Sequence, residues 1–391
     1  MRKVYMDHGA GMPLDSRVFE AMKPYFMDDY GNPSSSHSFG NSAKEALATS
    51  REKVAQLVAV EKPLEVIFTS GGTESNNLAI KGVAYRNREK GNHIITTAIE
   101  HISVINICKF LQKQGFEVTY IPVDKQGIVD IEKLTEAIND KTILISVMYA
   151  NGEIGTIQPI QEIGKLAQEN KVIFHVDAVD AAGKVPINVK EENIDLLSIS
   201  SNDMYGPKGV GAIYIKAGTK IQPIIQGGGQ ERGLRSGTEN IPGIVGMGKA
   251  AELAQKEMKS EGKRLAGLRD KLIKGVLDKI DYSFLNGHPT ERLPSNTNLR
   301  FSYIEGESLI LGLDMYGIQV SSGSACTSKT LEPSHVLLAI GLAHEEAHGS
   351  LVFTMGKQNS EEDVNYVLEV LPDVVKRLRA LSPLTPKEIV R

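Results

Sequence analysis

LEVIFTSGGTESNNLAI, residues 64–80, decides how this chain folds. An apolar run over 64–70 predicts a buried strand, and the pattern over 74–87 predicts a helix. The glycines between them predict a tight turn, with Gly72 and Thr73 where the helix starts. Backbone amides at a helix start attract anions, so phosphate binding is one interpretation. A plain strand–helix turn, with Thr73 as a simple N-cap, is the alternative.

Apolar runs and helical patterns continue to alternate after that turn. Strands that alternate with helices favour an α/β fold with a mostly parallel sheet, here of seven strands, covered on both faces. Ligands bind such sheets in the loops at the carboxyl ends of the strands. Further strands are expected at 93–98, 116–123, 142–150, 172–179, 194–200 and 210–216, with helices such as 102–114 and 160–170 between them.

The pattern changes after the glycine-rich segment 227–243, and a second domain is expected there. A long charged helical stretch follows, and then shorter elements that together predict a smaller α+β domain. We expect a large domain over 15–259 and a small domain made of 1–14 with 260–391. The elements expected after 243 are helices at 244–281, 307–316, 334–340 and 361–378, and strands at 296–304, 318–322 and 350–355.

Composition excludes several classes of protein. The 391 residues include 44 Lys+Arg and 48 Asp+Glu, for a net charge of −4 and no basic stripe, so nucleic acid is a poor candidate partner. The sequence has no apolar run of membrane-spanning length, and its first residues lack the apolar core of a signal peptide. Two cysteines do not make a disulfide framework, which is typical of a reducing compartment. We expect a cytoplasmic protein that binds neither nucleic acid nor membrane.

Two side chains at expected strand ends could act on a flat cofactor. His101 could stack on a ring or shuttle protons, and Asp177 could pair with a protonated pyridine nitrogen. An ordinary loop histidine and a helix N-cap are the respective alternatives. The segment 232–240, which contains Thr238, is either a loop that binds an anion or an irregular surface loop.

The two cysteines differ in their surroundings. Cys326 lies in a Gly/Ser segment before an expected helix, where an accessible thiol suits nucleophilic sulfur chemistry or metal ligation. Cys108 lies on an apolar pattern and is expected to be a small core residue. Neither belongs to a CxxC pair, which argues against a metal site made from cysteine alone.

The order of these motifs resembles that of the cysteine desulfurases that serve iron–sulfur cluster assembly. Those enzymes are fold-type I pyridoxal-phosphate (PLP) proteins related to the class V aminotransferases. The resemblance covers nearly the whole chain. It is carried by GNPSSSHSFG (31–40), TSGGTESNN (69–77), EHISV (100–104), NGEIGTIQPI (151–160), HVDA (175–178), YGPKGVGA (205–212), GGGQERGLRSGTEN (227–240), EGESL (305–309) and SSGSACTS (321–328).

The resemblance implies a set of site residues. In that family a lysine holds PLP as an imine, and a loop cysteine takes sulfur from L-cysteine as a persulfide and leaves alanine. The family is dimeric, and the threonine of RSGT reaches the phosphate bound by the partner. The implied catalytic residues are Cys326 and His101, and the implied cofactor contacts are Gly72, Thr73, His101, Asp177, Ser200, Asn202 and Thr238.

The departures from the family pattern gather around the cofactor. The lysine position is Asp203, which has no amine, and the residue before it is Asn202 in place of histidine. The arginine expected to bind the substrate carboxylate is Val352. Gly152 replaces the second asparagine of NNEIG, and Asp180 replaces the glutamine after HVDA. The chain is similar in this respect to archaeal members that have aspartate at the lysine position.

These departures predict an altered function. We expect an iron–sulfur assembly protein in which Cys326 carries a persulfide, or in which Cys326 ligates a 2Fe–2S cluster shared with a scaffold protein. In the second case the sulfur of the cluster would arrive as sulfide. Desulfurase activity is expected to be weak or absent. A lysine-independent cysteine desulfurase with noncovalent PLP is the alternative, and a different PLP reaction or a purely structural dimer is a third. Homodimerisation is implied by the resemblance.

Overall fold

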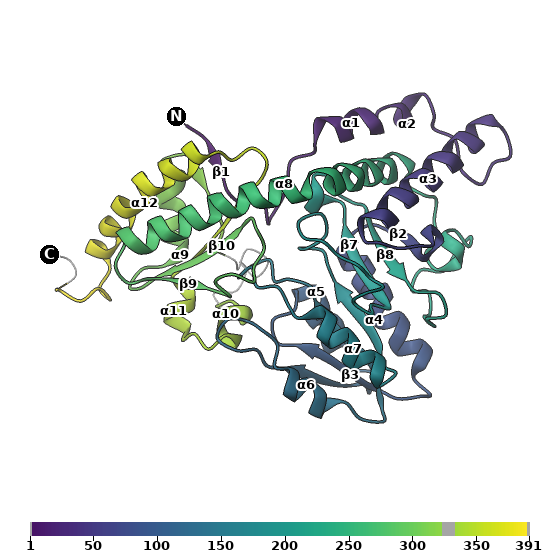
Figure 1. The fold of residues 1–391 in the computed structure, drawn as a ribbon, viewed down its shortest axis with the longest axis horizontal. Helices are drawn as coiled ribbons and strands as arrows, with labels where there is room; N and C mark the ends of the chain where they lie inside the picture. The colour runs from purple at the N-terminus through teal and green to yellow at the C-terminus, as the bar shows by residue number, and fades with distance from the viewer. Residues whose placement is uncertain (1, 323–332, 389–391) are drawn as a thin grey trace.

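A seven-stranded sheet forms the centre of the larger part of the molecule (Figure 1). The computed structural model describes residues 2–322 and 333–388. Every pairing in this sheet is parallel except those of β8, which runs antiparallel to both of its neighbours. The predicted α/β class and strand number are confirmed. The strand order is β2 (Val66–Thr69), β8 (Gly211–Ile215), β7 (Leu196–Ser200), β6 (Ile173–Asp177), β5 (Thr142–Met148), β3 (His93–Thr97) and β4 (Glu117–Ile121).

Both faces of this sheet are covered, because successive side chains of a strand point to opposite faces. In β3, Ile94 packs in the core that contains α4 (Gly72–Asn87) and α5 (Ile102–Gln112). Its neighbour Ile95 packs in the opposite core. The helices that contribute to that opposite core are α1 (Ser16–Met22), α3 (Ser38–Leu57), α6 (Ile131–Ala137), α7 (Ile160–Glu169) and α8 (Ile241–Lys279).

A smaller α+β unit lies at the other end of the molecule (Figure 1). Its antiparallel sheet has the order β12, β10, β9. The N-terminal strand β1 (Val4–Tyr5) pairs in parallel with β11 (Ile318–Gln319) in a separate two-stranded sheet, and isolated bridges from Asp7 and Ser321 connect the following residues to β12. Val4 and Met6 lie in the core of this unit, so the N-terminus packs there. Its other elements are β9 (Ser283–Asn286), β10 (Asn296–Phe301), α9 (Gly306–Asp314), α10 (His335–Ala339), α11 (His344–His348), β12 (Ser350–Thr354) and α12 (Glu361–Leu381).

Helix α8 joins the two units. Its buried residues up to Ala254 pack in the core of the large unit, whereas those from Leu265 onward pack in the core of the small one. We therefore keep the proposed boundary near residue 259, inside this helix. Across residues 2–322 and 333–388, none of the helices has the combination of length and apolar character needed to cross a membrane.

The helices α1 and α3, before the first strand of the large sheet, were not predicted from the sequence, and several short elements also differ from the expectations. Strand β9 was not predicted, and the strand expected at 318–322 covers only two residues, after which Ser321 forms an isolated bridge to Val352. Helix α11 was also not predicted. Such elements are too short to show a clear hydrophobic period, so tertiary pairing fixes them. The remaining helices are α2 (Pro24–Met27) and the 3-10 turns Pro63–Glu65, Asn202–Met204 and Glu231–Gly233.

Candidate functional site

A cavity of about 390 Å³ lies at the carboxyl ends of the central strands. This is where ligands bind in sheets of this type. Loops after β2, β3, β5, β6 and β7 form most of its wall, and β12 closes it from the small unit. Ten of the residues singled out from the sequence line it: Gly72, Thr73, His101, Gly152, Asp177, Asp180, Ser200, Asn202, Asp203 and Val352.

One end of the cavity is the amino terminus of α4. The helix begins at Gly72, followed by Thr73, and its dipole presents positive charge to the cavity. A side chain at Gly72 is excluded, because a Cβ there would lie 2.5 Å from a methyl of Val179. Glu74 in the same turn is paired with Arg235 at 2.9 Å. This end of the cavity therefore suits a phosphate group.

The side chain of Asp177 is held at the end of β6 and is almost fully buried. Its carboxylate accepts hydrogen bonds from Asn76 Nδ2 at 2.7 Å and from the Val179 amide at 3.1 Å. Burial raises the pKa of Asp177, and the nearby His101 opposes that rise. The same Asn76 Nδ2 also donates to the Ser103 hydroxyl at 3.1 Å. Asp177 is therefore fixed in orientation toward a cationic partner in the cavity.

The imidazole of His101 is oriented by the first turn of α5. Its Nδ1 accepts the backbone amide of Ser103 at 3.2 Å and lies 2.8 Å from the Ser103 hydroxyl. Because Nδ1 acts as an acceptor, the proton of the neutral ring is on Nε2. His101 lines the cavity, so this ring can stack on a flat ligand or exchange a proton with it.

Asp203 lies in the 3-10 turn Asn202–Met204 and is only 7% exposed. Burial raises the pKa of its carboxyl to about 6. The positive charge of Lys184 and a hydrogen bond with Ser200 favour ionisation, whereas the negative charges of Asp180 and Asp177 oppose it. The carboxyl group therefore occupies the place where the resemblance puts an amine.

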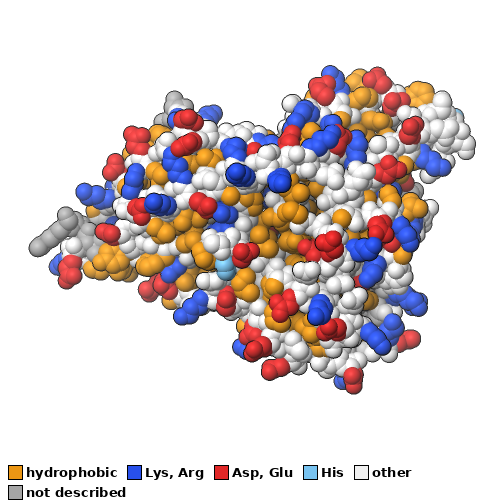
Figure 2. All heavy atoms as spheres, viewed as in Figure 1, with side chains coloured by type: hydrophobic (Ala, Val, Ile, Leu, Met, Phe, Trp, Pro, Cys, Tyr) orange, Lys and Arg blue, Asp and Glu red, His pale blue; other side chains and the backbone are white. Residues whose placement is uncertain are grey.

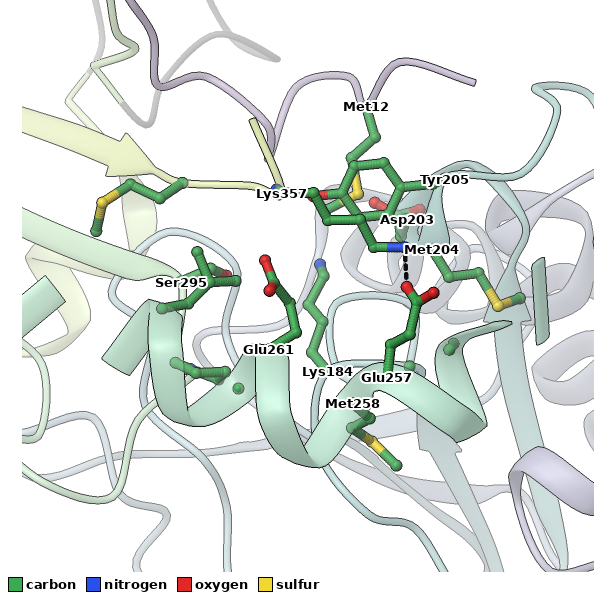
Figure 3. A pocket seen from close by; sticks show the side chains of 16 residues that line it. Met12, Lys184, Asp203, Met204, Tyr205, Glu257, Met258, Glu261, Ser295 and Lys357 are labelled. Atoms are coloured by element: carbon green, nitrogen blue, oxygen red, sulfur yellow. Dashed lines mark hydrogen bonds and ion pairs between the residues drawn. The ribbon is translucent and has the colours of Figure 1, made fainter. Parts of the chain in front are cut away.

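A second, smaller cavity of about 50 Å³ also has Asp203 in its wall (Figure 3). Lys184 extends into it from below, and Glu257 in its wall is paired with Lys357 at 2.6 Å (Figure 3). Asp203 lines both cavities, whereas Lys184 lines only the small one. Lys184 therefore does not replace the missing lysine within the large cavity.

The substitutions at 152 and 180 are linked sterically. A Cβ at Gly152 would lie 2.5 Å from a carboxylate oxygen of Asp180, so the two side chains compete for the same space. The acid at 180 therefore depends on a glycine at 152. Val352 is buried in β12 at the opposite wall and supplies an apolar surface where an arginine was expected.

Besides Asp7, two further acids, Glu100 and Glu153, line the cavity and were not predicted from the sequence. Glu100 is fully buried, accepts the Thr97 hydroxyl at 2.7 Å, and has its pKa raised to about 8 by burial. Glu153 accepts the Ser334 hydroxyl at 2.7 Å, and burial raises its pKa to about 7. Only their position in the sequence could have indicated them, because Glu100 lies in the motif EHISV and Glu153 in the motif NGEIG, and each motif follows a strand.

Two predicted site residues are not placed in this cavity. Cys326 lies outside the described residues, although Ser321 before that stretch and Ser334 after it both line the cavity. Thr238 is exposed and does not line the cavity of its own chain. Its expected contact with a partner's cofactor stays a prediction.

The described residues fit part of a PLP molecule. The start of α4 suits its phosphate, His101 suits its ring face, and Asp177 suits its pyridine nitrogen. Asn76 Oδ1 is buried in the same wall with no hydrogen-bond partner among the described residues, which leaves room for a donor from a ligand. The covalent link does not fit, because Asp203 has no amine.

Comparison with known proteins gives the family of this chain. The sequence model of the family described as "Aminotransferase class-V" matches residues 4–367. The chain is 57% identical to the protein named cysteine desulfurase IscS 1 of Archaeoglobus fulgidus, over 97% of this chain and 99% of that one. It is 56% identical to cysteine desulfurase IscS of Methanosarcina thermophila, over 99% and 95%.

A solved structure gives the same result for the fold. The structure titled "NIFS-LIKE PROTEIN" superposes with a TM-score of 0.90 at 39% identity and covers 96% of this chain and all of its own. The chain therefore belongs to the class-V aminotransferase family, within the branch of the IscS-type cysteine desulfurases.

Proposed function

We propose that this protein serves iron–sulfur cluster assembly through Cys326, as a persulfide carrier or as a ligand of a 2Fe–2S cluster shared with a scaffold protein. Its own desulfurase activity is weak or absent. The observation that carries the proposal is Asp203, a buried carboxyl group in the wall of the cofactor cavity. A carboxylate can neither bind the cofactor covalently nor supply the proton transfers of an amine, and loss of general acid–base help alone costs about 10²–10⁴-fold in rate.

The rest of the cavity supports this proposal. No lysine or arginine lies among the described residues that line it. Val352 therefore leaves the carboxylate of a cysteine substrate without a cationic partner from this chain's described residues. We propose that this chemistry takes place in the cytoplasm, because two cysteines do not make a disulfide framework, which is typical of a reducing compartment. Thiolate is the usual protein ligand of an iron–sulfur cluster.

The test compares the two cysteines in the full chain. Cys326→Ala and Cys108→Ala are each purified without oxygen and mixed with an iron–sulfur scaffold protein, ferrous iron and sulfide. Visible absorption and iron content of the isolated complex are measured. We expect Cys326→Ala to lose most of the shared cluster, and Cys108→Ala to keep it, because Cys108 is fully buried and burial raises the pKa of its thiol to about 12. Equal cluster content in the wild-type protein and in both variants would contradict the proposal.

A second function is favoured by the intact phosphate and ring contacts. In this alternative, PLP binds without a covalent link, and His101 exchanges protons with the substrate. L-cysteine then gives its sulfur atom to the Cys326 thiol, leaving alanine and a Cys326 persulfide. Bound PLP would stabilise the negative charge that develops on the substrate.

This alternative is tested by turnover. Purified protein with added PLP and L-cysteine is assayed for alanine and, with a thiol reductant, for sulfide. Sustained turnover that is lost in Cys326→Ala would support the alternative over the first proposal. Asp203→Lys should acquire the absorption of lysine-bound cofactor, and we expect its turnover to remain low while Val352 is unchanged.

A further inference from the structure

The large cavity has an unusual distribution of charge. Its described wall contains two histidines, His101 and His335, and no lysine or arginine. Burial raises the pKa of Asp203 to about 6 and that of Glu153 to about 7, because removing a carboxylate from water disfavours its charged form. The acids that line the wall are Asp7, Glu100, Glu153, Asp177, Asp180 and Asp203.

The other end of the same cavity has the opposite preference. The amino terminus of α4, with Gly72 and Thr73, favours a phosphate. The charges of the cavity wall thus favour a ligand with an anionic group at one end and a cationic group at the other. The aldehyde form of the family's cofactor lacks the second feature, because its 4′ carbonyl oxygen is an acceptor.

We propose that this cavity selects the amine form of the cofactor, pyridoxamine phosphate, whose protonated 4′-aminomethyl group pairs with Asp203 and Asp180. The inference deepens the proposed function by naming the ligand of the same site. It does not depend on whether Cys326 carries sulfur or binds a cluster.

An unsatisfied acceptor next to Asp203 supports an ammonium ligand. Asn202 Oδ1 is buried and has no partner in the described part of the chain. Asn202 lines the cavity and precedes Asp203 in the same 3-10 turn. An ammonium supplies three donors, whereas an aldehyde supplies none, and a buried acceptor left without a donor costs free energy.

The two acids that would face the amine lie where the surrounding chain leaves room for them. Asp180 lies over Gly152, where a Cβ would approach its carboxylate to 2.5 Å. Asp203 is fixed in its 3-10 turn, and Lys184 favours its ionised form from the small cavity (Figure 3). Because Lys184 does not line the large cavity, its charge helps to keep Asp203 ionised without occupying the space of the ligand.

Calorimetric titration of the full-length protein at pH 8 tests this selection. The probes are pyridoxamine phosphate and 4′-deoxypyridoxine phosphate, which differ in having an aminomethyl or a methyl group and cannot react with lysines. A charge-assisted hydrogen bond corresponds to about tenfold to hundredfold in affinity. We expect the wild-type protein to prefer the amine by at least about tenfold.

Three variants locate the source of the preference. Asp203→Asn should bring the two affinities close together, and Asp180→Asn should reduce the preference in part. Glu261→Gln is the matched control, since Glu261 lines only the small cavity and should leave the preference unchanged. Thermal unfolding of each variant shows whether it is folded. Cys326→Ala should retain the wild-type preference.

Equal wild-type affinities for the two probes, or a preference that survives Asp203→Asn, would overturn the inference. Failure of both probes to bind would overturn it as well. None of these results bears on the cluster content measured with Cys326→Ala, so the two proposals can fail separately.

Discussion

At the scale of single residues, the site is defined by a carboxyl group where an amine was expected. Asp203 is buried beside two other acids, and Lys184 partly balances its charge from the neighbouring cavity. The substitution can be seen in the sequence. The surroundings of Asp203 cannot be seen in the sequence, because Lys184 is 19 positions away along the chain and comes near Asp203 only in the tertiary fold.

The raised pKa of Asp203 predicts how stability changes with pH. The folded value of about 6 lies above the ordinary value of 3.8, so the folded protein holds this proton more tightly than the unfolded chain. The contribution of Asp203 to stability therefore falls as pH rises from about 4 to about 6. Asp203→Asn should stabilise the protein at pH 8 by about 2–3 kcal/mol more than at pH 4. Denaturant unfolding at both pH values measures this, and an equal effect at both would contradict it.

The contact between Gly152 and Asp180 predicts a coupled pair. Gly152→Ala alone should destabilise the protein by about 1–3 kcal/mol, because the new Cβ would meet the Asp180 carboxylate. In the presence of Asp180→Ala most of that cost should disappear. A double-mutant cycle from urea unfolding gives the coupling energy. Additive effects of the two substitutions would show that the side chains do not compete for space.

At the scale of elements, α8 matters most because it packs in the cores of both units. Its length and position were close to the sequence-based expectation, since its helical pattern is long. Its role as the link between the units was not evident, because a hydrophobic period does not show which core a buried residue joins. The short strands β9 and β11 were missed or overextended for the related reason that pairing with distant segments forms them.

Two glycines of α8 make a matched comparison of helix propensity and close packing. Gly267 is exposed, with no atom within 4 Å of an added Cβ, so Gly267→Ala should stabilise the protein by about 0.5–1 kcal/mol. At Gly248 a Cβ would lie 2.7 Å from Ser50 Cα in α3, so Gly248→Ala should destabilise it by about 1–3 kcal/mol. Thermal or urea unfolding measures both. Effects of the same sign would contradict this packing of α8 on α3.

At the scale of the whole molecule, we expect two copies to associate. Thr238 is exposed and outside its own chain's cavity, and the N-terminal helices carry a group of exposed apolar side chains. The positive and negative side chains on the face in Figure 2 are interspersed, so no single-sign field marks that face. The apolar group, which would be covered in a dimer, consists of Phe19 (48% exposed), Phe26 (58%), Met27 (80%), Tyr30 (69%) and Phe39 (43%).

Sedimentation of the wild-type chain should give twice the monomer mass of 42.6 kDa. Phe26→Asp combined with Met27→Asp should shift the protein toward monomer, because charges would replace exposed apolar area in the interface. Leu381→Asp, at a distant exposed position in α12, is the control and should leave the mass unchanged. A wild-type monomer, or a dimer unaffected by the double substitution, would rule out this interface.

The sequence by itself determined the fold class, the seven-stranded sheet and the family. Strand and helix periods are local, and the motifs at the strand ends lie in a fixed order along the chain. It also indicated that Asp203, Gly152, Asp180 and Val352 depart from the family pattern. Only the tertiary structure brought these positions into one cavity with Glu100 and Asn76, and placed Lys184 behind its wall. Burial and the contacts between distant segments set the charge of the site, and both of these depend on the folded chain.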